Sequence, residues 1–286
     1  MSELQAVIRR ITCEEQQYWR VLKRGHALAE QMMTNGFRNT VIFEPWGGTF
    51  PITTAGAKHY GWTNSQPLDK IDGYDLLKVD GKQLLWNILD SHDPILTVIA
   101  FDCRIWSPLT RLSPNIDWDE WRRTTGRATL SLIRAICRQR IKQGRFFLIE
   151  NPLGADSWHY GSYLQDVFDM DGVAFTSCHQ CAYGAVDSES GDPIKKPTGW
   201  MSNSPAVLNE LSRQCTCSRQ HALVLGSNAN GTRSSQAGRY PPDLARAVCH
   251  GLLQQIRIEA AIQLAGSGIQ HFAFLGYSAS RKQLFS

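Results

Sequence analysis

The chain has 286 residues, of which 42% are hydrophobic and 20% are charged, with a formal net charge of +4. This composition is typical of a globular protein with its own core, and no apolar run is long enough to cross a bilayer. The first residues lack the pattern of a secretory signal or transit peptide. We therefore expect an intracellular protein, located in the cytoplasm of a prokaryote or virus-infected cell, or in a nucleus.

The chain begins with a predicted helix and a first strand–turn–helix unit. A capping box at residues 12–15 starts a helix in an N-terminal extension of residues 1–36. Residues 39–43 predict a strand, residues 44–48 a glycine turn and residues 55–60 a helix. Many nucleotide-binding folds open with this order of elements.

Strands and helices continue to alternate through the middle of the chain. Residues 68–71 predict a strand, residues 83–89 a helix, and residues 95–101 a strand that is buried on both faces. Residues 118–142 predict an amphipathic helix with several arginines, and residues 146–149 another buried strand. This alternation favours an α/β fold with a doubly wound, mostly parallel sheet.

The pattern loosens in the last third of the chain. Residues 173–176 predict a strand, residues 187–204 are rich in turn formers, and residues 241–265 predict a long helix that begins at a proline. The expected organisation is a helical extension over 1–36, a catalytic and cofactor-binding α/β core over 37–174, a small insertion over 175–239 that recognises substrate or binds zinc, and a C-terminal helix and strand over 240–286 that complete the core.

Two of the predicted strands end in side chains with chemical potential. Cys103 follows the strand at 95–101, and Glu150 follows the strand at 146–149. Parallel strands of an open α/β sheet place their carboxyl ends at the edge where ligands bind. A thiol beside positive charge can act as a nucleophile, and a nearby carboxyl group can manage a proton on the substrate. A cysteine in this position can equally be a small buried hydrophobe.

The order of these motifs resembles the DNA cytosine-5 methyltransferases. In that family an apolar strand ends in Pro-Cys-Gln with a downstream Phe-Ser, and the next strand ends in Glu-Asn-Val; this chain has Asp-Cys-Arg-Ile-Trp-Ser at 102–107 and Glu-Asn-Pro at 150–152. Residues 43–48 stand where the family has a Phe-x-Gly-x-Gly cofactor turn, and residues 240–248 resemble the helix that completes the cofactor pocket. The resemblance covers residues 40–155 well and 238–252 weakly. Between them, the chain is more similar to methylase-like reading frames of phages and mobile elements.

This resemblance implies a Rossmann-like class I methyltransferase fold, S-adenosylmethionine as cofactor, and DNA or, as a second choice, RNA as substrate. Catalysis would use Cys103 and Glu150: the thiolate adds to C6 of a flipped-out cytosine, while the carboxyl group hydrogen-bonds N3. The implied cofactor-binding residues are Phe43, Glu44, Trp46, Gly47, Gly48, Asp69 and Asp102, with Asp69 favoured over Asp72 and Asp75 as the ribose ligand. The implied substrate-binding residues are Arg104, Ser107, Asn151, Lys195 and Lys196.

The sequence also departs from that family. Asp102 replaces the proline before the nucleophile, and its charge would raise the pKa of the Cys103 thiol unless Arg104 offsets it. The Gln-x-Arg-x-Arg element that holds cytosine O2 is missing, which leaves Lys195, Lys196, Arg233 and Arg239 as candidate replacements. An alternative interpretation is therefore a catalytically inactive methyltransferase-fold protein that binds nucleic acid or another partner.

Cysteine spacing raises a separate possibility, a structural zinc site. The candidate ligands are Cys178, Cys181, Cys215, Cys217 and His221. The gap between Cys178 and Cys181 is usual for zinc, whereas the Cys-x-Cys spacing of the second pair is not. Packing of the segment 180–184 as a strand-to-turn element is the competing interpretation, and a bound ion would also allow metal-dependent processing of nucleic acid.

Basic and aromatic residues permit a nucleic-acid partner without requiring one. Arginines and lysines gather at residues 122–123, 134–145 and 195–196. The tract at 195–200 is interpreted either as a nucleic-acid loop with a stacking tryptophan or as a solvated hairpin edge. The remaining tryptophans that we considered are expected in the core or at an interface: Trp106, Trp118, Trp121 and Trp158.

Overall fold

The computed structural model describes residues 40–48, 52–108, 110, 115–224, 226–228, 231–232 and 237–265. The helix predicted from residue 12 lies outside these ranges. The chain divides into two compact units, one formed by residues 38–252 with 278–286 and the other by residues 1–37 with 253–277. The account below concerns the first unit; the described part of the second is the end of one helix, residues 253–265.

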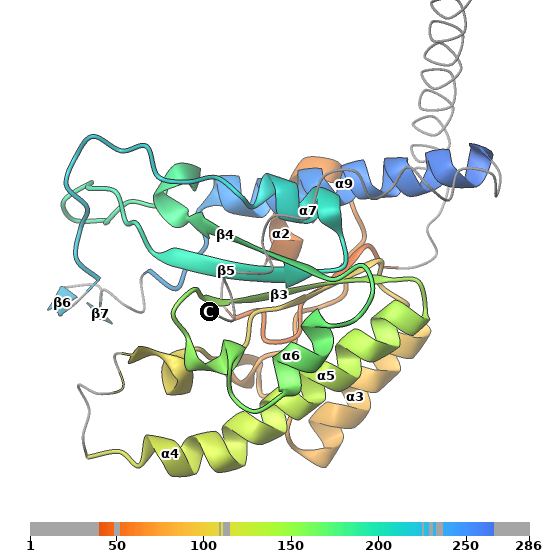
Figure 1. Ribbon diagram of the computed structural model, residues 1–286, viewed down its shortest axis with the longest axis horizontal. Helices are drawn as coiled ribbons and strands as arrows, with labels where there is room; N and C mark the ends of the chain where they lie inside the picture. Colours follow the sequence, from red (N-terminus) through yellow and green to blue (C-terminus); the bar gives the residue numbers. More distant parts are fainter. Residues whose placement is uncertain are drawn as a thin grey trace, which may run out of the picture. The chain divides into compact units, whose positions relative to one another are not determined.

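One mixed sheet of five strands forms the centre of the fold, in the order β1-β2-β3-β5-β4 (Figure 1). The strands are β1 (Ile42–Phe43), β2 (Leu96–Ile99), β3 (Phe146–Pro152), β4 (Ala174–His179) and β5 (Pro197–Ser202). β1, β2 and β3 are parallel, whereas β5 runs antiparallel to both β3 and β4. A separate pair of two-residue strands, β6 (Ser227–Asn228) and β7 (Gly231–Thr232), lies outside this sheet.

The prediction of a strand at residues 68–71 is wrong for all but its first residue. Leu68 forms a single parallel bridge with Pro45. The next residues turn into the 3-10 helix η1 (Lys70–Asp72), because the Asp69 side chain accepts a hydrogen bond from the Ile71 amide and caps this turn. Leu68 nevertheless extends the sheet past β1, on the side away from β2.

Helices cover both faces of the sheet. Figure 1 shows α3 (Val79–Ser91), α5 (Arg127–Lys142) and α6 (Tyr163–Phe168) on one face. The other face carries α2 (Ile52–Tyr60), α7 (Pro205–Glu210) and the part of α9 (Pro242–Ala265) up to Leu252. This arrangement confirms an α/β fold with helices on both sides. Within the part of the chain that the structure describes, no helix combines the length and the hydropathy of a membrane span.

The long helix predicted at residues 118–142 forms with an irregular turn inside it. It consists of α4 (Trp118–Trp121), a π-helical turn η4 (Arg122–Gly126) and α5. Asp117 caps its start by accepting a hydrogen bond from the Glu120 amide. A Cβ atom on Gly126 would lie 2.7 Å from the indole of Trp106, so only glycine lets the helix approach this side chain.

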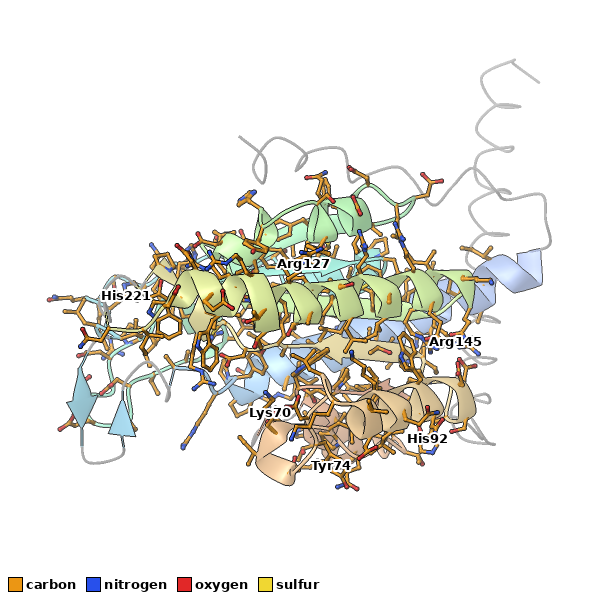
Figure 2. The ribbon with its side chains drawn as sticks, turned by 90° about the horizontal axis from the view of Figure 1, so that it is seen from below. Lys70, Tyr74, His92, Arg127, Arg145 and His221 are labelled. Atoms are coloured by element: carbon orange, nitrogen blue, oxygen red, sulfur yellow. The ribbon has the colours of Figure 1, made fainter. Side chains whose placement is uncertain are left out.

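Three arginines in and after this helical region form ion pairs within the fold. Arg140 is fully buried and pairs with Asp93, which also pairs with Arg145. Arg134 pairs with Asp166 at 2.6 Å. Figure 2 shows Arg127 and Arg145 near the two ends of α5. These ion pairs therefore join α5 and the start of β3 to neighbouring elements.

Two interpretations were open for the tract at residues 195–200, a nucleic-acid loop and a solvated hairpin edge. From Pro197 onward both are wrong, because these residues form a strand. The tract enters β5, which lies between β3 and β4, and Trp200 is fully buried there. A Cβ atom on Gly199 would lie 2.7 Å from the Phe175 ring, so the strand is packed closely on this face. The segment expected as a separate insertion, residues 175–239, thus shares the central sheet up to Ser202.

Candidate active site

Three strand ends meet at one edge of the sheet. Glu44 follows β1, Cys103 follows β2, and Glu150 lies near the end of β3. The order of the sheet reverses between β1 and β2, because the chain passes from β1 to Leu68 on one side and then to β2 on the other. Ligands of open α/β sheets bind outside the carboxyl ends of the strands at such a reversal. The three side chains therefore lie where a ligand site is expected.

Glu150 is buried between two polar partners. The Lys196 ammonium lies 4.0 Å from its Oε1, and Tyr240 donates a hydrogen bond to its carboxylate. Burial raises the pKa of Glu150 above its ordinary value, and the charge of Lys196 and the hydrogen bond from Tyr240 only partly oppose this. Among the described residues, Oε1 has no hydrogen-bond partner. Glu150 is thus a buried carboxyl group that takes up a proton more readily than an exposed one does.

Cys103 lies at the start of the 3-10 helix η2 (Arg104–Trp106). Its carbonyl accepts a hydrogen bond from the Trp106 amide, and the buried Trp106 side chain anchors the turn in the core. Burial raises the pKa of the thiol to about 11, and the charge of Glu150 adds to this shift while that of Lys196 opposes it. At neutral pH the resting thiol is therefore protonated.

Asp102, which stands where the resembled family has a proline, is paired with the adjacent Arg104. Arg104 donates to Asp102 from its backbone amide at 2.9 Å and from its guanidinium at 2.6 Å. Burial alone would raise the pKa of Asp102, but these hydrogen bonds hold it below its ordinary value. Asp102 still raises the pKa of Cys103, although less than Glu150 does. The Arg104 side chain is 80% exposed, which leaves it accessible from solvent.

Tyr240 is a site residue that sequence reasoning did not single out. It lies two residues before the start of α9, and its ring centroid lies 6.1 Å from that of Trp200. Burial raises the pKa of its hydroxyl well above 10, and the charges of Glu150, Glu44 and Cys103 add to the shift. The pKa of this one side chain thus responds to a residue at each of the three strand ends. The Tyr-Pro-Pro run predicted the start of a helix, but not the contact with β3.

Glu44 is buried at the entrance to α2. Its Oε2 accepts a hydrogen bond from the Thr53 amide in the first turn of that helix, at 3.0 Å, while Oε1 has no partner among the described residues. Burial raises the pKa of Glu44 to about 8. A buried carboxyl oxygen without a partner is complementary to a cation or to an N–H donor.

The glycine turn after Glu44 is held by Asp69. The Gly48 amide donates to Asp69 Oδ2 at 3.2 Å, and the other Asp69 oxygen accepts from Ile71. Gly48 has a φ of +61°, and no atom lies within 4 Å of where its Cβ would be. Gly47 is instead pressed against Pro67, because a Cβ atom on this glycine would lie 2.7 Å from the proline ring. Asp69 therefore organises the turn, a role distinct from the ribose ligand implied by the resemblance.

The other residues implied by the resemblance lie around this edge in different roles. Phe43 is fully buried in β1, and Trp46 adopts a φ of 62° in the turn. Asn151 is buried, and its amide group donates to the Phe101 carbonyl at 3.5 Å, which joins β3 to the end of β2. Ser107 ends η2 and accepts hydrogen bonds from Thr110. Lys195 contributes its backbone carbonyl, which accepts from Gln180.

Four of the five candidate metal ligands come together in the structure. The donor atoms of Cys181, Cys215, Cys217 and His221 all lie within 4.8 Å of one another. Cys178 is not in this group: it belongs to β4, and its thiol accepts a hydrogen bond from the Trp200 indole at 3.2 Å. The Cys-x-x-Cys spacing is therefore divided between a buried strand position and the cluster.

Two hollows in the described surface lie elsewhere. One, of about 300 Å³, is lined by residues that include Arg122 and Tyr160, and the other, of about 450 Å³, by residues that include Arg213 and His250. Neither is lined by Cys103 or Glu150. The candidate site is thus defined by its position in the sheet and by the contacts of its side chains.

No protein-family model matches the chain, and no curated protein matches it. What the strand ends present is a partly exposed thiol, a buried carboxyl group with a raised pKa, an ammonium group and a phenol. These groups are suited to nucleophilic addition to a ring that must also be protonated.

Proposed function

We propose that the chain is an S-adenosylmethionine-dependent cytosine-5 methyltransferase that acts on DNA, with Cys103 as nucleophile and Glu150 as acid. The observation that carries this proposal is the meeting of these two residues at the ends of adjacent parallel strands, where the charge of Glu150 acts on the thiol. Lys196 and Tyr240 complete the group by binding Glu150. Burial of the Glu150 carboxyl group carries a desolvation cost, which is common at functional sites.

The strand order supports the finer assignment to a class I methyltransferase fold. Leu68 extends the sheet beyond β1, and the antiparallel strand β5 lies between β3 and the edge strand β4. An otherwise parallel sheet with one antiparallel strand next to its edge is characteristic of that fold. The resemblance in motif order concerns residue types, whereas this topology concerns the pairing of strands.

Proton movement between the two residues gives a consistent mechanism. The proton that the Cys103 thiol loses is accepted by the Glu150 carboxylate and passed to N3 of the base. The sulfur then bonds to C6, and the C5–C6 electron pair makes C5 a nucleophile. Neutralising Glu150 also removes the largest neighbouring charge that raises the thiol pKa. After methylation of C5, loss of the C5 proton to a base restores the C5–C6 double bond and breaks the C6–S bond, and the proton on N3 returns through Glu150 to the Cys103 thiolate.

The residues after β1 fit the cofactor. S-adenosylmethionine supplies a methyl group carried on a positively charged sulfonium, and it also carries an amino group. Glu44 offers a buried carboxyl oxygen without a partner, and the turn at Gly48 leaves open space. These residues, with Trp46 between them, would hold the cofactor, while Asp69 keeps the turn in shape.

Covalent capture tests the nucleophile directly. In the presence of S-adenosylmethionine, the wild-type protein should form a denaturation-resistant adduct with an oligonucleotide that contains 5-fluorocytosine, because fluorine cannot leave as a proton does. Cys103→Ala should form none, whereas Cys137→Ala, which removes a buried thiol of α5, should still form it. A wild-type protein that binds the cofactor and the oligonucleotide but never forms the adduct would refute the mechanism.

A second candidate is a protein of the same fold that binds nucleic acid without transferring methyl groups. The observation that favours it is the resting thiol, whose pKa of about 11 leaves it protonated. Calorimetric titration with S-adenosylmethionine separates the two. If the cofactor cation binds beside Glu44, the proton that Glu44 holds at pH 7 should be released, and the heat should depend on the ionisation enthalpy of the buffer. Glu44→Gln should lose this dependence, and absence of binding heat in any buffer would favour the second candidate.

A further inference from the structure

A cluster of soft side chains lies just beyond the carboxyl end of β4, at the same edge of the sheet as the strand ends described above. Cys181 belongs to the short 3-10 helix η6 (Gln180–Tyr183), while Cys215, Cys217 and His221 belong to the segment that follows α7. Cys181, Cys215 and His221 are half-buried. Figure 2 labels His221. Two segments that are distant in sequence therefore bring three thiols and an imidazole to one point.

The distances in this cluster suit a tetrahedral metal ion. All four donor atoms lie within 4.8 Å of one another, and Cys215 Sγ lies 3.2 Å from His221 Nε2. Zinc bonds of about 2.3 Å to sulfur and about 2.0 Å to nitrogen place the corners of a tetrahedron roughly 3.5–3.8 Å apart. A contraction of about 1 Å or less at the widest pair would therefore suffice to bind one ion.

Backbone contacts already hold the two segments in place. The Cys217 amide donates to Cys215 Sγ at 3.4 Å, an N–H to sulfur contact that stabilises a thiolate ligand. The Cys215 amide donates to His179 Nδ1 at 3.2 Å, and the His179 amide donates to the Arg213 carbonyl at 3.1 Å. The segment is thus tied to the end of β4 directly beside the ligands.

We propose that Cys181, Cys215, Cys217 and His221 bind one structural zinc ion. Three thiolates and one imidazole fill the four positions of a tetrahedral zinc, so none remains for water or substrate. The thiols lose their protons to solvent when the metal binds. Cys178 is not a ligand, because its thiol lies in the sheet against Trp200. This proposal stands apart from the proposed methyl transfer, since it concerns metal content alone.

The ion would also fix the chain near Glu150. Gln180, the residue before Cys181, donates its amide to the carbonyls of Lys195 and Lys196, and its side chain donates to Thr198. Lys196 is the residue whose ammonium lies 4.0 Å from Glu150. Zinc at Cys181 therefore anchors the backbone that carries Lys196 toward the candidate active site.

Metal analysis of the purified, untagged protein tests the site. Elemental mass spectrometry should find one zinc ion per chain in the wild-type protein, and Cys217→Ser should lose this zinc. Cys178→Ala is the matched control: it removes the other cysteine of the Cys-x-x-Cys pair and should keep one zinc. Cobalt-substituted wild-type protein should show the intense visible bands of a tetrahedral site with thiolate ligands.

Measurements on the wild-type protein keep the proposal testable if a variant fails to fold. Alkylation of Cys181, Cys215 and Cys217 should be at least tenfold faster after a chelator has removed the metal than before, whereas Cys178 should not change. Wild-type protein that holds no metal after growth and refolding with zinc, that holds iron instead, or that shows a disulfide among these cysteines, would overturn the proposal. So would retention of zinc by a folded Cys217→Ser.

Discussion

The charge of Glu150 changes how readily Cys103 holds a proton. Burial is the largest cause of the rise in the pKa of Cys103, and the carboxylate of Glu150 is the next. Lys196 acts in the opposite direction on both groups, since its positive charge favours the thiolate and the carboxylate alike. Besides burial, the reactivity of the thiol thus depends on the charges of Glu150, which lies in β3, and of Lys196, which lies just before β5.

We predict opposite changes in thiol reactivity when these two partners are neutralised. Glu150→Gln should lower the pKa of Cys103 and speed its alkylation at pH 9, and Lys196→Gln should slow it. Each change should be roughly severalfold, because one pKa unit corresponds to about a tenfold change in thiolate fraction. The rate of iodoacetamide modification of the peptide that contains Cys103, followed by mass spectrometry over a range of pH, measures both.

Lys195→Gln is the matched control for this experiment. Its charge is adjacent in sequence, but Lys195 is not one of the largest contributors to the pKa of Cys103, so the alkylation profile of this variant should lie closer to that of the wild-type protein. Equal effects of the two lysine substitutions would mean that the charge of Lys196 has no special position. A slower rate in Glu150→Gln would contradict the direction proposed here.

Sequence reasoning found the residues of the candidate site that directly follow apolar strands. Cys103 and Glu150 belong to this class, because a buried parallel strand is recognisable from a few residues and its end is the expected ligand edge. Tyr240 and the buried state of Glu44 could not be found in this way. Both depend on how α9 and α2 pack over the strand ends, which no local pattern of residue types encodes.

β5 shows the same limit among the secondary-structure elements. Its sequence, Pro-Thr-Gly-Trp-Met-Ser, contains a proline and a glycine and follows a turn-rich stretch, so local signals favour a loop. In the structure Pro197 is the first residue of the strand, where its missing N–H is tolerated, and Gly199 makes room for the Phe175 ring. Pairing with β3 and β4 decided the outcome over local propensity.

The π-helical turn before α5 packs against the loop that carries Cys103. Gly126 approaches Trp106, the buried residue that anchors η2 and therefore Cys103. π-helical turns have no simple sequence signature, so the prediction of one continuous helix missed it. The Arg122 guanidinium reinforces the contact by donating to the Ile105 carbonyl at 2.8 Å.

Gly126→Ala should destabilise the protein even though alanine is the better helix former. Its Cβ atom would lie 2.7 Å from the Trp106 ring, and forced repacking of a buried side chain costs about 1–3 kcal/mol, more than the roughly 1 kcal/mol gained in helix propensity. The free energy of unfolding in urea measures the difference. Gly154→Ala, where no atom lies within 4 Å of the new Cβ, should be close to neutral, and equal stability of the two variants would disprove the contact.

For the molecule as a whole, the buried Glu44 makes stability depend on pH. The folded chain keeps a proton on Glu44 up to a pKa of about 8, whereas the unfolded chain loses it near the ordinary value of 4.5. Between these two values the native state binds more protons than the unfolded state, so the free energy of unfolding falls as the pH rises. The contribution is present in full below pH 4.5 and is lost by about pH 8.

We predict that Glu44→Gln removes this part of the pH dependence. The difference in unfolding free energy between variant and wild type should move in favour of the variant from pH 5 to pH 8, by a few kcal/mol, since each pKa unit is worth about 1.4 kcal/mol. Urea unfolding at several pH values measures it, with Glu120→Gln on the exposed side of α4 as the control. Parallel pH curves for Glu44→Gln and wild type would show that Glu44 titrates normally.

The position of β5 also constrains how the chain can assemble. β3 and β4 leave the ribosome before β5, yet they are neighbours of β5 and not of each other. Until Ser202 has been synthesised, the edge of β3 lacks its partner and offers open backbone groups to other chains. The strand that closes this gap also brings Trp200 and the backbone next to Lys196 over Glu150. Completion of the sheet therefore places Lys196 beside Glu150, and Tyr240, which follows later in the chain, completes the enclosure of this carboxyl group.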